Sequence, residues 1–353
     1  MKKFFLPFVH LCRWVLGLPP AYPPGAMKRW VFRFLSAMFI VLIGWFLFLG
    51  PGVVLMPFVP RGFESIADLT SRVYYQKDAG AAHKVLRLAG EAQNAILDFW
   101  GTPGKIELFE GIKIYQCETS AAYYGLTMNR AGGSAMFGSV IVIDITKAGQ
   151  ALSLEDFIRH ELGHIYLRRR LGFLRKHLTV PAWFDEGCAV RVQGSSPDVH
   201  SLGDILRIRP RLLSLTSLRY QTDWETMVSM EGSRLARQHY GYVGAFLEYI
   251  ERRFGIEKVR EYLNALSWGE NPHAVFARIY GSLLADLEAQ FLSDYRLMKG
   301  IKEEIEIIAP PLIPSVIVRW LLIFGILVLT ALWMIRQTFR ASRFVSKKLG
   351  SFR

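Results

Sequence analysis

HELGH, residues 160–164, places two histidines and a glutamate within a stretch that has the apolar periodicity of a helix. An α-helix turns about 100° per residue, so His160 and His164 project from one face, one turn apart, with Glu161 alongside. Two imidazoles in this arrangement can bind one Zn²⁺, while the glutamate takes a proton from a zinc-activated water. The alternative is a pair of helix histidines that form hydrogen bonds in a protein core.

The residues around this stretch predict where its helix begins and ends. Ser153, followed three residues later by Asp156, is typical of a capping box, and Gly172 is a suitable C-terminal stop. We therefore expect a helix over 154–171. Two faces of this expected helix are bordered by apolar residues, and one of them carries the histidines. Such a helix is expected to lie between two structural halves, where a metal cleft can form.

A catalytic zinc generally has three protein ligands and an open position, so a third ligand is needed. The stretch TVPAWFDEGCAVRVQG, residues 179–194, has the start and stop signals of a second helix, with Glu186 near its middle. The connection from Gly172 is short. The second helix can therefore return antiparallel and direct Glu186 toward the histidines, although a surface carboxylate is the alternative. Asp185 is interpreted as either a partner of a ligand histidine or an exposed neighbour.

The order HELGH followed by PAWFDEGCA resembles the H-E-x-x-H and W-x-x-E-G-x-A signature of gluzincin metallopeptidases, in particular the aminopeptidase N-like and peptidase MA-like families. The stretch from His239 to Arg296 also resembles the helical C-terminal part of peptidase MA-like domains, so the likeness covers roughly 64–297. The resemblance implies an α+β, zincin-like metallopeptidase domain, mostly helical with a small sheet. It implies zinc ligands at His160, His164 and Glu186.

The same resemblance implies roles for two further groups. Glu161 would be the general base, and Tyr240 would stabilise the oxyanion, with Tyr242 and His239 as substitutes. A tyrosine at this place can equally be a half-buried core residue.

Two departures from the family separate this chain from the aminopeptidases. Twenty-one residues lie between His164 and Glu186, against eighteen in aminopeptidase N-like enzymes, so the connecting loop differs. The glycine-x-Met-Glu-Asn motif that holds a free amino group is absent, because GSAMFG (133–138) has no carboxylate. Aminopeptidase activity is therefore not implied. This stretch and the strand after it are still expected to align an extended peptide by edge pairing.

The net charge of +13 is concentrated at the two ends of the chain. Residues 1–60 and 315–353 contain Lys and Arg but no Asp or Glu, whereas acids and bases balance between them. This distribution favours membrane topology over a nucleic-acid partner. Two apolar runs, 34–60 and 315–335, are long enough to cross a bilayer, and the flanking bases predict that both termini are cytoplasmic.

The resulting domain organisation has five parts. We expect a cytoplasmic or interfacial arm at 1–33, a span at 34–60, an extracytoplasmic peptidase domain at 61–314, a second span at 315–335 and a basic cytoplasmic tail at 336–353. Within the domain, helices are predicted at 64–77, 80–100, 233–254, 256–267, 271–280 and 282–297, and strands at 105–109, 113–117 and 139–146. A glycine-rich loop is predicted between the last two strands. Cys117 and Cys188 are predicted to be two unpaired buried side chains, with a disulfide as the alternative.

These features predict a zinc metallopeptidase anchored in the plasma membrane, which hydrolyses peptide or protein substrates in the cell envelope by means of zinc-activated water. The partners expected are that substrate and the lipid bilayer, and no nucleic acid. The rival hypothesis is an inactive zincin-fold module for binding or assembly, anchored in the same way. The run Arg168–Arg170 is interpreted as a solvated helix end.

Overall fold

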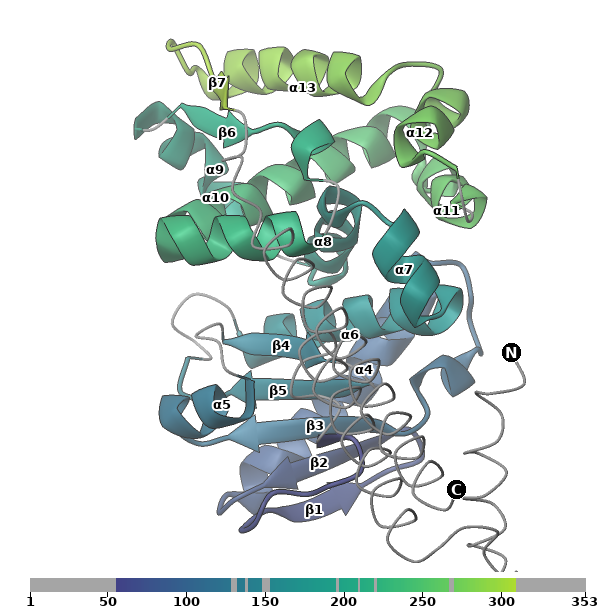
Figure 1. Ribbon diagram of the computed structural model, residues 1–353, viewed down its shortest axis with the longest axis vertical. Helices are drawn as coiled ribbons and strands as arrows, with labels where there is room; N and C mark the ends of the chain where they lie inside the picture. Colours follow the sequence, from purple (N-terminus) through teal and green to yellow (C-terminus); the bar gives the residue numbers. More distant parts are fainter. Residues whose placement is uncertain are drawn as a thin grey trace, which may run out of the picture. The chain divides into compact units, whose positions relative to one another are not determined.

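The computed structural model describes residues 55–127, 132–136, 139–147, 153–194, 197–208, 210–218, 221–266 and 270–308. All of them belong to one compact unit, Pro51–Ile317. The unit combines a β-sheet with helices that cover it and a larger group of helices beyond one of its edges (Figure 1). The fold is therefore α+β, as the sequence predicts.

Five strands form a mixed sheet in the order β1-β2-β3-β5-β4. The three inner strands run parallel, and the two edge strands are antiparallel to their neighbours. Strand β5 is buried at every position, which explains the apolar run VIVI that precedes Asp144 at its end. The bounds are Glu64–Ala67 (β1), Ser71–Tyr75 (β2), Ile112–Cys117 (β3), Gly133–Met136 (β4) and Val140–Asp144 (β5).

The two faces of the sheet are covered by different helices. Helices α4 (Ala79–Phe99) and α6 (Leu154–Leu171) pack against each other and bury one face in the main hydrophobic core. Helix α5 (Ser120–Thr127) contacts β3 and β5 from the other face, over a smaller core rich in tyrosine. Helix α6 also contacts the edge strand β4 and lies between it and α8 (Figure 1). Its histidine face thus meets the boundary between sheet and helices.

The helical part packs around Trp183, whose side chain is fully buried. Its ring contacts Phe184, Phe246, Tyr262 and Phe276, which joins α8 to α10, α11 and α12. The helices are Phe173–Thr179 (α7), Ala182–Val192 (α8), Pro197–Ile208 (α9), Gln221–Phe254 (α10), Ile256–Ala265 (α11), Pro272–Tyr280 (α12) and Leu284–Lys299 (α13). Strands Arg211–Leu213 (β6) and Glu306–Ile308 (β7) pair in parallel. Trp183 therefore fixes the helix that carries Glu186.

Three glycines allow the helices of the site to approach closely. A Cβ on Gly163 of α6 would lie 3.1 Å from Val192 of α8, and a Cβ on Gly187 of α8 would lie 3.1 Å from the Val243 carbonyl of α10. A Cβ on Gly244 of α10 would collide with Val190. Interiors are packed to crystal-like density, so such contacts hold the three helices at a fixed separation.

Three sequence predictions in the sheet region are wrong. Residues 64–77 form the β1–β2 hairpin rather than a helix, because Asp68 accepts hydrogen bonds from the backbone N–H groups of Thr70 and Ser71 and turns the chain. Residues Ile106–Phe109, predicted as part of a strand, form the short 3₁₀ helix η1. The glycine-rich segment predicted as a loop contributes the edge strand β4. The strands predicted at 113–117 and 139–146 are confirmed as β3 and β5.

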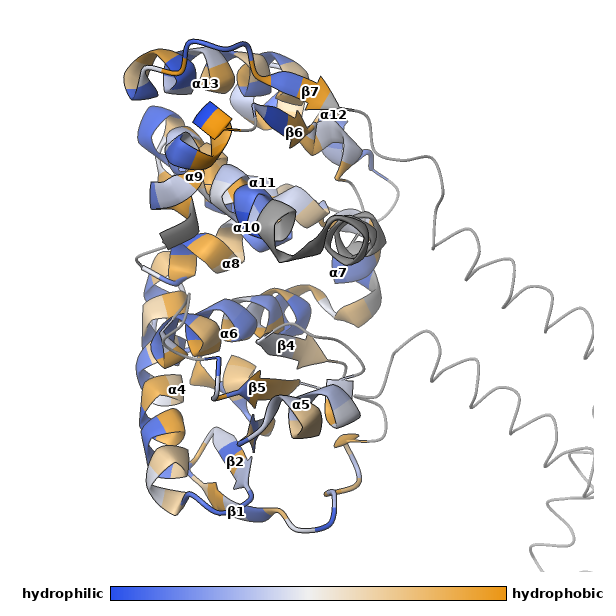
Figure 2. Ribbon diagram, turned by 90° about the vertical axis from the view of Figure 1, so that its left-hand side faces the viewer, coloured by the Kyte–Doolittle hydropathy of each residue, from blue (hydrophilic) through white to orange (hydrophobic). Residues whose placement is uncertain are grey.

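The expected membrane architecture is wrong for the part of the chain that the structure describes. No helix there is both long and apolar enough to cross a bilayer. Figure 2 shows the reason: each of the long helices mixes polar and apolar residues along its length, as helices on the surface of a core do.

This finding overturns the expected placement of the domain between two transmembrane helices, and with it the localisation predicted from that placement. The segments predicted as spans, 34–60 and 315–335, lie outside the described residues except for 55–60. Among these, Leu55 is helical, residues 56–57 form a turn and residues 58–60 have no regular secondary structure.

Candidate metal centre

Helix α6 begins and ends where the sequence predicts. The Ser153 side chain accepts a hydrogen bond from the Asp156 backbone, and the Asp156 carboxylate accepts one from the Ser153 backbone, which completes a capping box. The helix ends at Gly172, which adopts a φ of +82° that side chains rarely tolerate. With both ends fixed, His160 and His164 project from one face, and both are buried.

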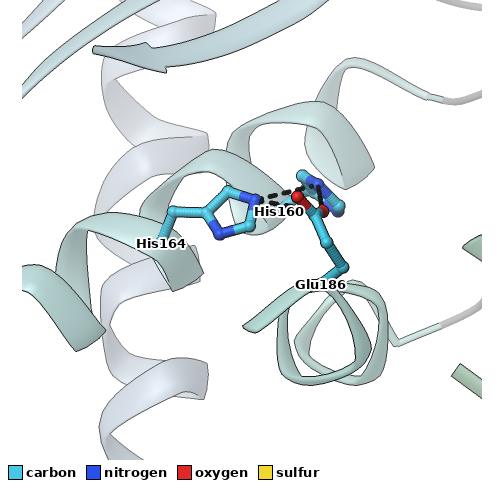
Figure 3. Close-up of side chains that lie close together, drawn as sticks. All are labelled: His160, His164 and Glu186. Carbon is cyan, nitrogen blue, oxygen red and sulfur yellow. Dashed lines mark hydrogen bonds and ion pairs between the residues drawn. The ribbon is translucent and has the colours of Figure 1, made fainter. Parts of the chain in front are cut away.

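Three side chains from two helices converge on one point (Figure 3). The Nε2 atoms of His160 and His164 lie 3.2 Å apart. The Glu186 Oε2 atom of α8 lies 3.4 Å from each of them. The sequence predicted these three residues as ligands, and the structure brings all three together.

The outer nitrogen of each histidine is held by a different partner. His164 Nδ1 donates to the Asp185 carboxylate at 2.9 Å, and His160 Nδ1 donates to the Gln193 side-chain oxygen at 3.2 Å. Asp185 in turn pairs with the buried Lys176 of α7. Because Nδ1 carries the proton in each neutral ring, both Nε2 lone pairs point toward Glu186.

The charges around this cluster shift two ionisations in opposite directions. Burial alone would raise the pKa of Glu186. When the histidines are protonated, their positive charges and the hydrogen bonds that they donate lower that pKa to about 2. Burial alone would lower the pKa of His164, but Asp185 and Glu186 raise it to about 10. Without a metal, His164 therefore holds a proton among the two Nε2 atoms and the Glu186 carboxylate, which are otherwise acceptors.

The arrangement fits a divalent metal ion such as Zn²⁺. Around a tetrahedral ion with ligand distances of about 2.0–2.1 Å, neighbouring donor atoms are about 3.3 Å apart. The observed separations of 3.2 and 3.4 Å match one face of that tetrahedron. Two imidazole nitrogens and one carboxylate oxygen are also the donor set of His₂Glu zinc sites, and the fourth vertex has no protein ligand in this set.

Glu161 lies beside this triangle without being part of it. Its carboxylate accepts a hydrogen bond from the backbone N–H of Ala135 on β4, and a Cβ on Gly133 would lie 2.8 Å from its Oε1 atom. Burial raises the pKa of Glu161, against the opposing effect of the nearby histidines. The glycine thus lets the edge strand approach a buried carboxylate that has an increased affinity for a proton.

Of the three groups considered for the oxyanion, only one faces the candidate metal ligands. The ring of Tyr240 lies 5.6 Å from the ring of His160, edge to face. Tyr242 is buried and donates a hydrogen bond to Glu288 at 2.6 Å, while His239 accepts one from the Leu213 backbone at 2.9 Å. The two substitutes are thus engaged in the packing of the helical part, and Tyr240 is the residue positioned at the site.

The structure also corrects the interpretation of charged residues near the site. Arg168 is not in a solvated helix end: it donates hydrogen bonds to the carbonyl groups of Ala135 and Met136 on β4. For Asp185 the structure confirms one of the two alternatives, because this residue is buried as the partner of His164. Sequence reasoning missed Lys176 and Gln193 as partners, because no local pattern marks contacts between helices that are formed only on folding.

The comparisons with known proteins give no family for this chain. No family model matches it, and no curated protein matches it either. The resemblance to gluzincin peptidases therefore remains a prediction that rests on its motif.

Cys117 and Cys188 are both free and buried, in agreement with the prediction that they do not pair.

Proposed function

We propose that this domain is a zinc-dependent peptidase that hydrolyses peptide bonds. The observation that supports the proposal is the triangle of His160, His164 and Glu186, whose donor atoms have the separations of a tetrahedral site. Glu161 adjoins it and is directed elsewhere, which leaves this carboxylate available as a base. A pair of histidines placed only to fill a core would not need this arrangement.

The ion supplies Lewis acidity when it is bound, since it lowers the pKa of a water toward about 7 and polarises a carbonyl group. The chain supplies the remaining chemistry. The Glu161 carboxylate accepts the proton of the attacking water and returns it to the nitrogen of the leaving amine. Burial raises the pKa of Glu161 above its ordinary value, which favours a carboxylate that accepts a proton and later donates it.

Two features would orient the substrate. The Tyr240 hydroxyl would donate a hydrogen bond to the oxyanion as the carbonyl carbon becomes tetrahedral. The edge strand β4 would align an extended peptide by backbone pairing. These assignments make peptides the substrate class, with no requirement for a free amino group.

The test is the substitution Glu161→Gln in the full chain. Because Glu161 is not a ligand in this proposal, the variant should bind about one zinc per chain, as the wild type should. It should lose cleavage of a quenched peptide library by a factor on the order of 10²–10⁴, the usual contribution of general acid–base catalysis. Metal content is measured by elemental analysis and cleavage by fluorescence.

His83→Ala is a matched control, because this exposed histidine of α4 lies outside the ligand set. It should change neither metal content nor cleavage. Absence of zinc from the wild type would contradict the proposed metal. Zinc without any cleavage of the library would favour the rival hypothesis of an inactive binding module.

A further inference from the structure

Arg168 lies on α6 one turn after the ligand His164 and two turns after His160. Residues at this spacing share one face of a helix, so the guanidinium extends the line of metal ligands toward one end of the site. Its charge also acts on Glu161 and Asp185, and it helps to lower the pKa of His177 on α7, after burial as the main cause. Arg168 is therefore part of the site's surroundings.

The guanidinium has hydrogen-bond partners but no counter-ion. It donates to the carbonyl groups of Ala135 and Met136, and its Nε atom is buried without a hydrogen-bond partner. No ion pair between described residues includes Arg168. Burial lowers the pKa of Arg168, as expected for a cation that is only partly compensated.

The other charges of the site have partners that leave Arg168 unmatched. Asp185 pairs with Lys176. A divalent ion would be balanced by the two glutamates, Glu186 as its ligand and Glu161 alongside. Once these pairs are made, the half-buried Arg168 is the one remaining charge among these groups. A buried guanidinium is stable when a carboxylate meets its two-pronged donor edge.

The strand that Arg168 contacts is the one expected to align the substrate. The Asp144 backbone N–H donates to the Gly132 carbonyl at 2.8 Å, and because pairing alternates in an antiparallel ladder, Gly133 and Ala135 point away from β5. The outward groups of Ala135 are already engaged: the N–H by Glu161 and the carbonyl by Arg168. A peptide pairing along this edge must compete with Arg168.

We propose that Arg168 is a specificity-determining residue that binds a carboxylate of the peptide substrate. The inference rests on the proposed peptidase function and narrows its substrate class to peptides with a carboxylate near the scissile bond, either a Glu or Asp side chain or a free C-terminus. The guanidinium exchanges the Ala135 carbonyl for the substrate carboxylate. That carbonyl is then free to accept an N–H from the bound peptide, so that charge recognition and edge pairing occur together.

The experiment measures binding separately from cleavage. Glu161→Gln is used as a background that binds peptides without cleaving them. The affinity of the zinc-loaded Glu161→Gln chain is measured for four decapeptide libraries. The libraries carry glutamate or glutamine at one varied position and end in a free acid or an amide. Libraries with a carboxylate should bind about 10- to 100-fold more tightly than the library with glutamine and an amide, the range expected for a charge-assisted hydrogen bond. Comparison of the four libraries identifies whether the side chain or the C-terminus is recognised.

Variants of the arginines assign the effect. Arg168→Gln in the same background should remove the preference for carboxylates, and Arg168→Lys should retain part of it, since it keeps the charge but not the fork. Arg170→Gln is the matched control. Arg170 is on the same helix and donates to Tyr166 and Asn264 rather than to β4, so the preference should be unchanged. Zinc content and thermal unfolding are measured for every variant.

The outcomes separate this inference from the proposed function. Equal affinity for all four libraries, or no binding of any of them, would overturn it without the use of an arginine variant. If Arg168→Gln fails to fold, the test still rests on two proteins: the Glu161→Gln background with Arg168 intact, and the same background with Arg168→Lys. Cleavage by the wild-type chain without preference for carboxylates would preserve the peptidase and reject the role of Arg168. Selective binding with no cleavage would reject the peptidase and retain the carboxylate site.

Discussion

Two buried glutamates, Glu186 of α8 and Glu288 of α13, have opposite surroundings. Glu288 accepts hydrogen bonds from the Tyr242 hydroxyl, the Ser214 hydroxyl and the Leu215 backbone, so its partners are neutral donors. Glu186 faces two imidazole nitrogens that are themselves acceptors in the neutral ring. The donors around Glu288 satisfy its carboxylate, whereas the atoms around Glu186 form a set that could hold a cation.

The pKa values follow the same division. Burial raises the pKa of Glu288, because neutral donors only partly offset the loss of water. The histidines lower the pKa of Glu186, although Glu186 is buried at least as deeply as Glu288. The direction of the pKa shift of a buried carboxylate in this fold thus depends on whether its neighbours are neutral donors or histidine nitrogens. The predictions below test that difference.

The largest expected effect is the loss of metal from the Glu186 cluster. Glu186→Ala should bind no zinc, and its stability should not respond to a chelator. The wild type should lose about 4 kcal/mol on chelation if the ion is supplied at about 1,000 times its dissociation constant. Glu288→Ala is the matched control and should retain the chelator response. Denaturant unfolding with and without chelator measures both, and a wild type indifferent to chelation would contradict the distinction.

Two tyrosines of α10 should report on the two clusters separately. Tyr240→Phe should lower kcat by about 10²–10³-fold, the usual effect of losing an oxyanion donor, with little change in stability. Tyr242→Phe should leave kcat unchanged but cost about 1–3 kcal/mol, because Glu288 loses a hydrogen bond in a buried place. Steady-state kinetics and unfolding of both variants provide the measurement. The reverse pattern would show that the oxyanion role belongs elsewhere.

The partners of the two histidines should contribute unequally to metal affinity. Asp185→Asn should weaken zinc binding by about 10- to 100-fold, because it removes the charge that orients His164 and leaves Lys176 unpaired. Gln193→Ala removes only a neutral partner of His160 and should weaken binding by less, about 2- to 10-fold. Competition with a fluorescent chelator measures both affinities. Equal effects would mean that the charge at Asp185 is not used in metal binding.

The smallest effect concerns the dependence of stability on pH. Since the folded pKa of Glu288 is raised, its contribution is complete below the unfolded pKa of about 4.3 and is lost as the pH rises through the folded value. Glu288→Gln cannot ionise and should lack this loss. The stability difference between variant and wild type should therefore move in favour of the variant from pH 4 to pH 8. Urea unfolding in the presence of a chelator tests this, and a constant difference would contradict it.

Local patterns predicted the centre of the site well. The ends of α6 follow from Ser153, Asp156 and Gly172, and the spacing of His160 and His164 fixes their common face. These are interactions within a few residues of one another, so the sequence determines them without the fold. Glu186 needed one further step, the antiparallel return of a second helix, which a short connection permits.

Contacts between distant segments could not be predicted in this way. Lys176 and Gln193 are partners of the site only because α7 and α8 pack beside α6. The strand β4 was missed because glycine weakens the strand pattern, yet Gly133 is the residue that lets this strand approach Glu161. The hairpin at β1–β2 was missed because SRVYY lacks the alternation of a half-buried strand: four of its five residues are buried. Apolar composition at 34–60 and 315–335 predicted a membrane protein, and no described helix has that character.

The engagement of β4 by side chains has a consequence for the solution behaviour of the chain. An edge strand with free N–H and carbonyl groups is a template on which a strand of another molecule can add, which leads to aggregation. On β4 the outward carbonyl of Gly133 accepts a hydrogen bond from Tyr123, and the outward groups of Ala135 are taken by Glu161 and Arg168. The residues that would open this edge to a substrate thus close it to other copies of the chain, so their loss should increase self-association at high concentration.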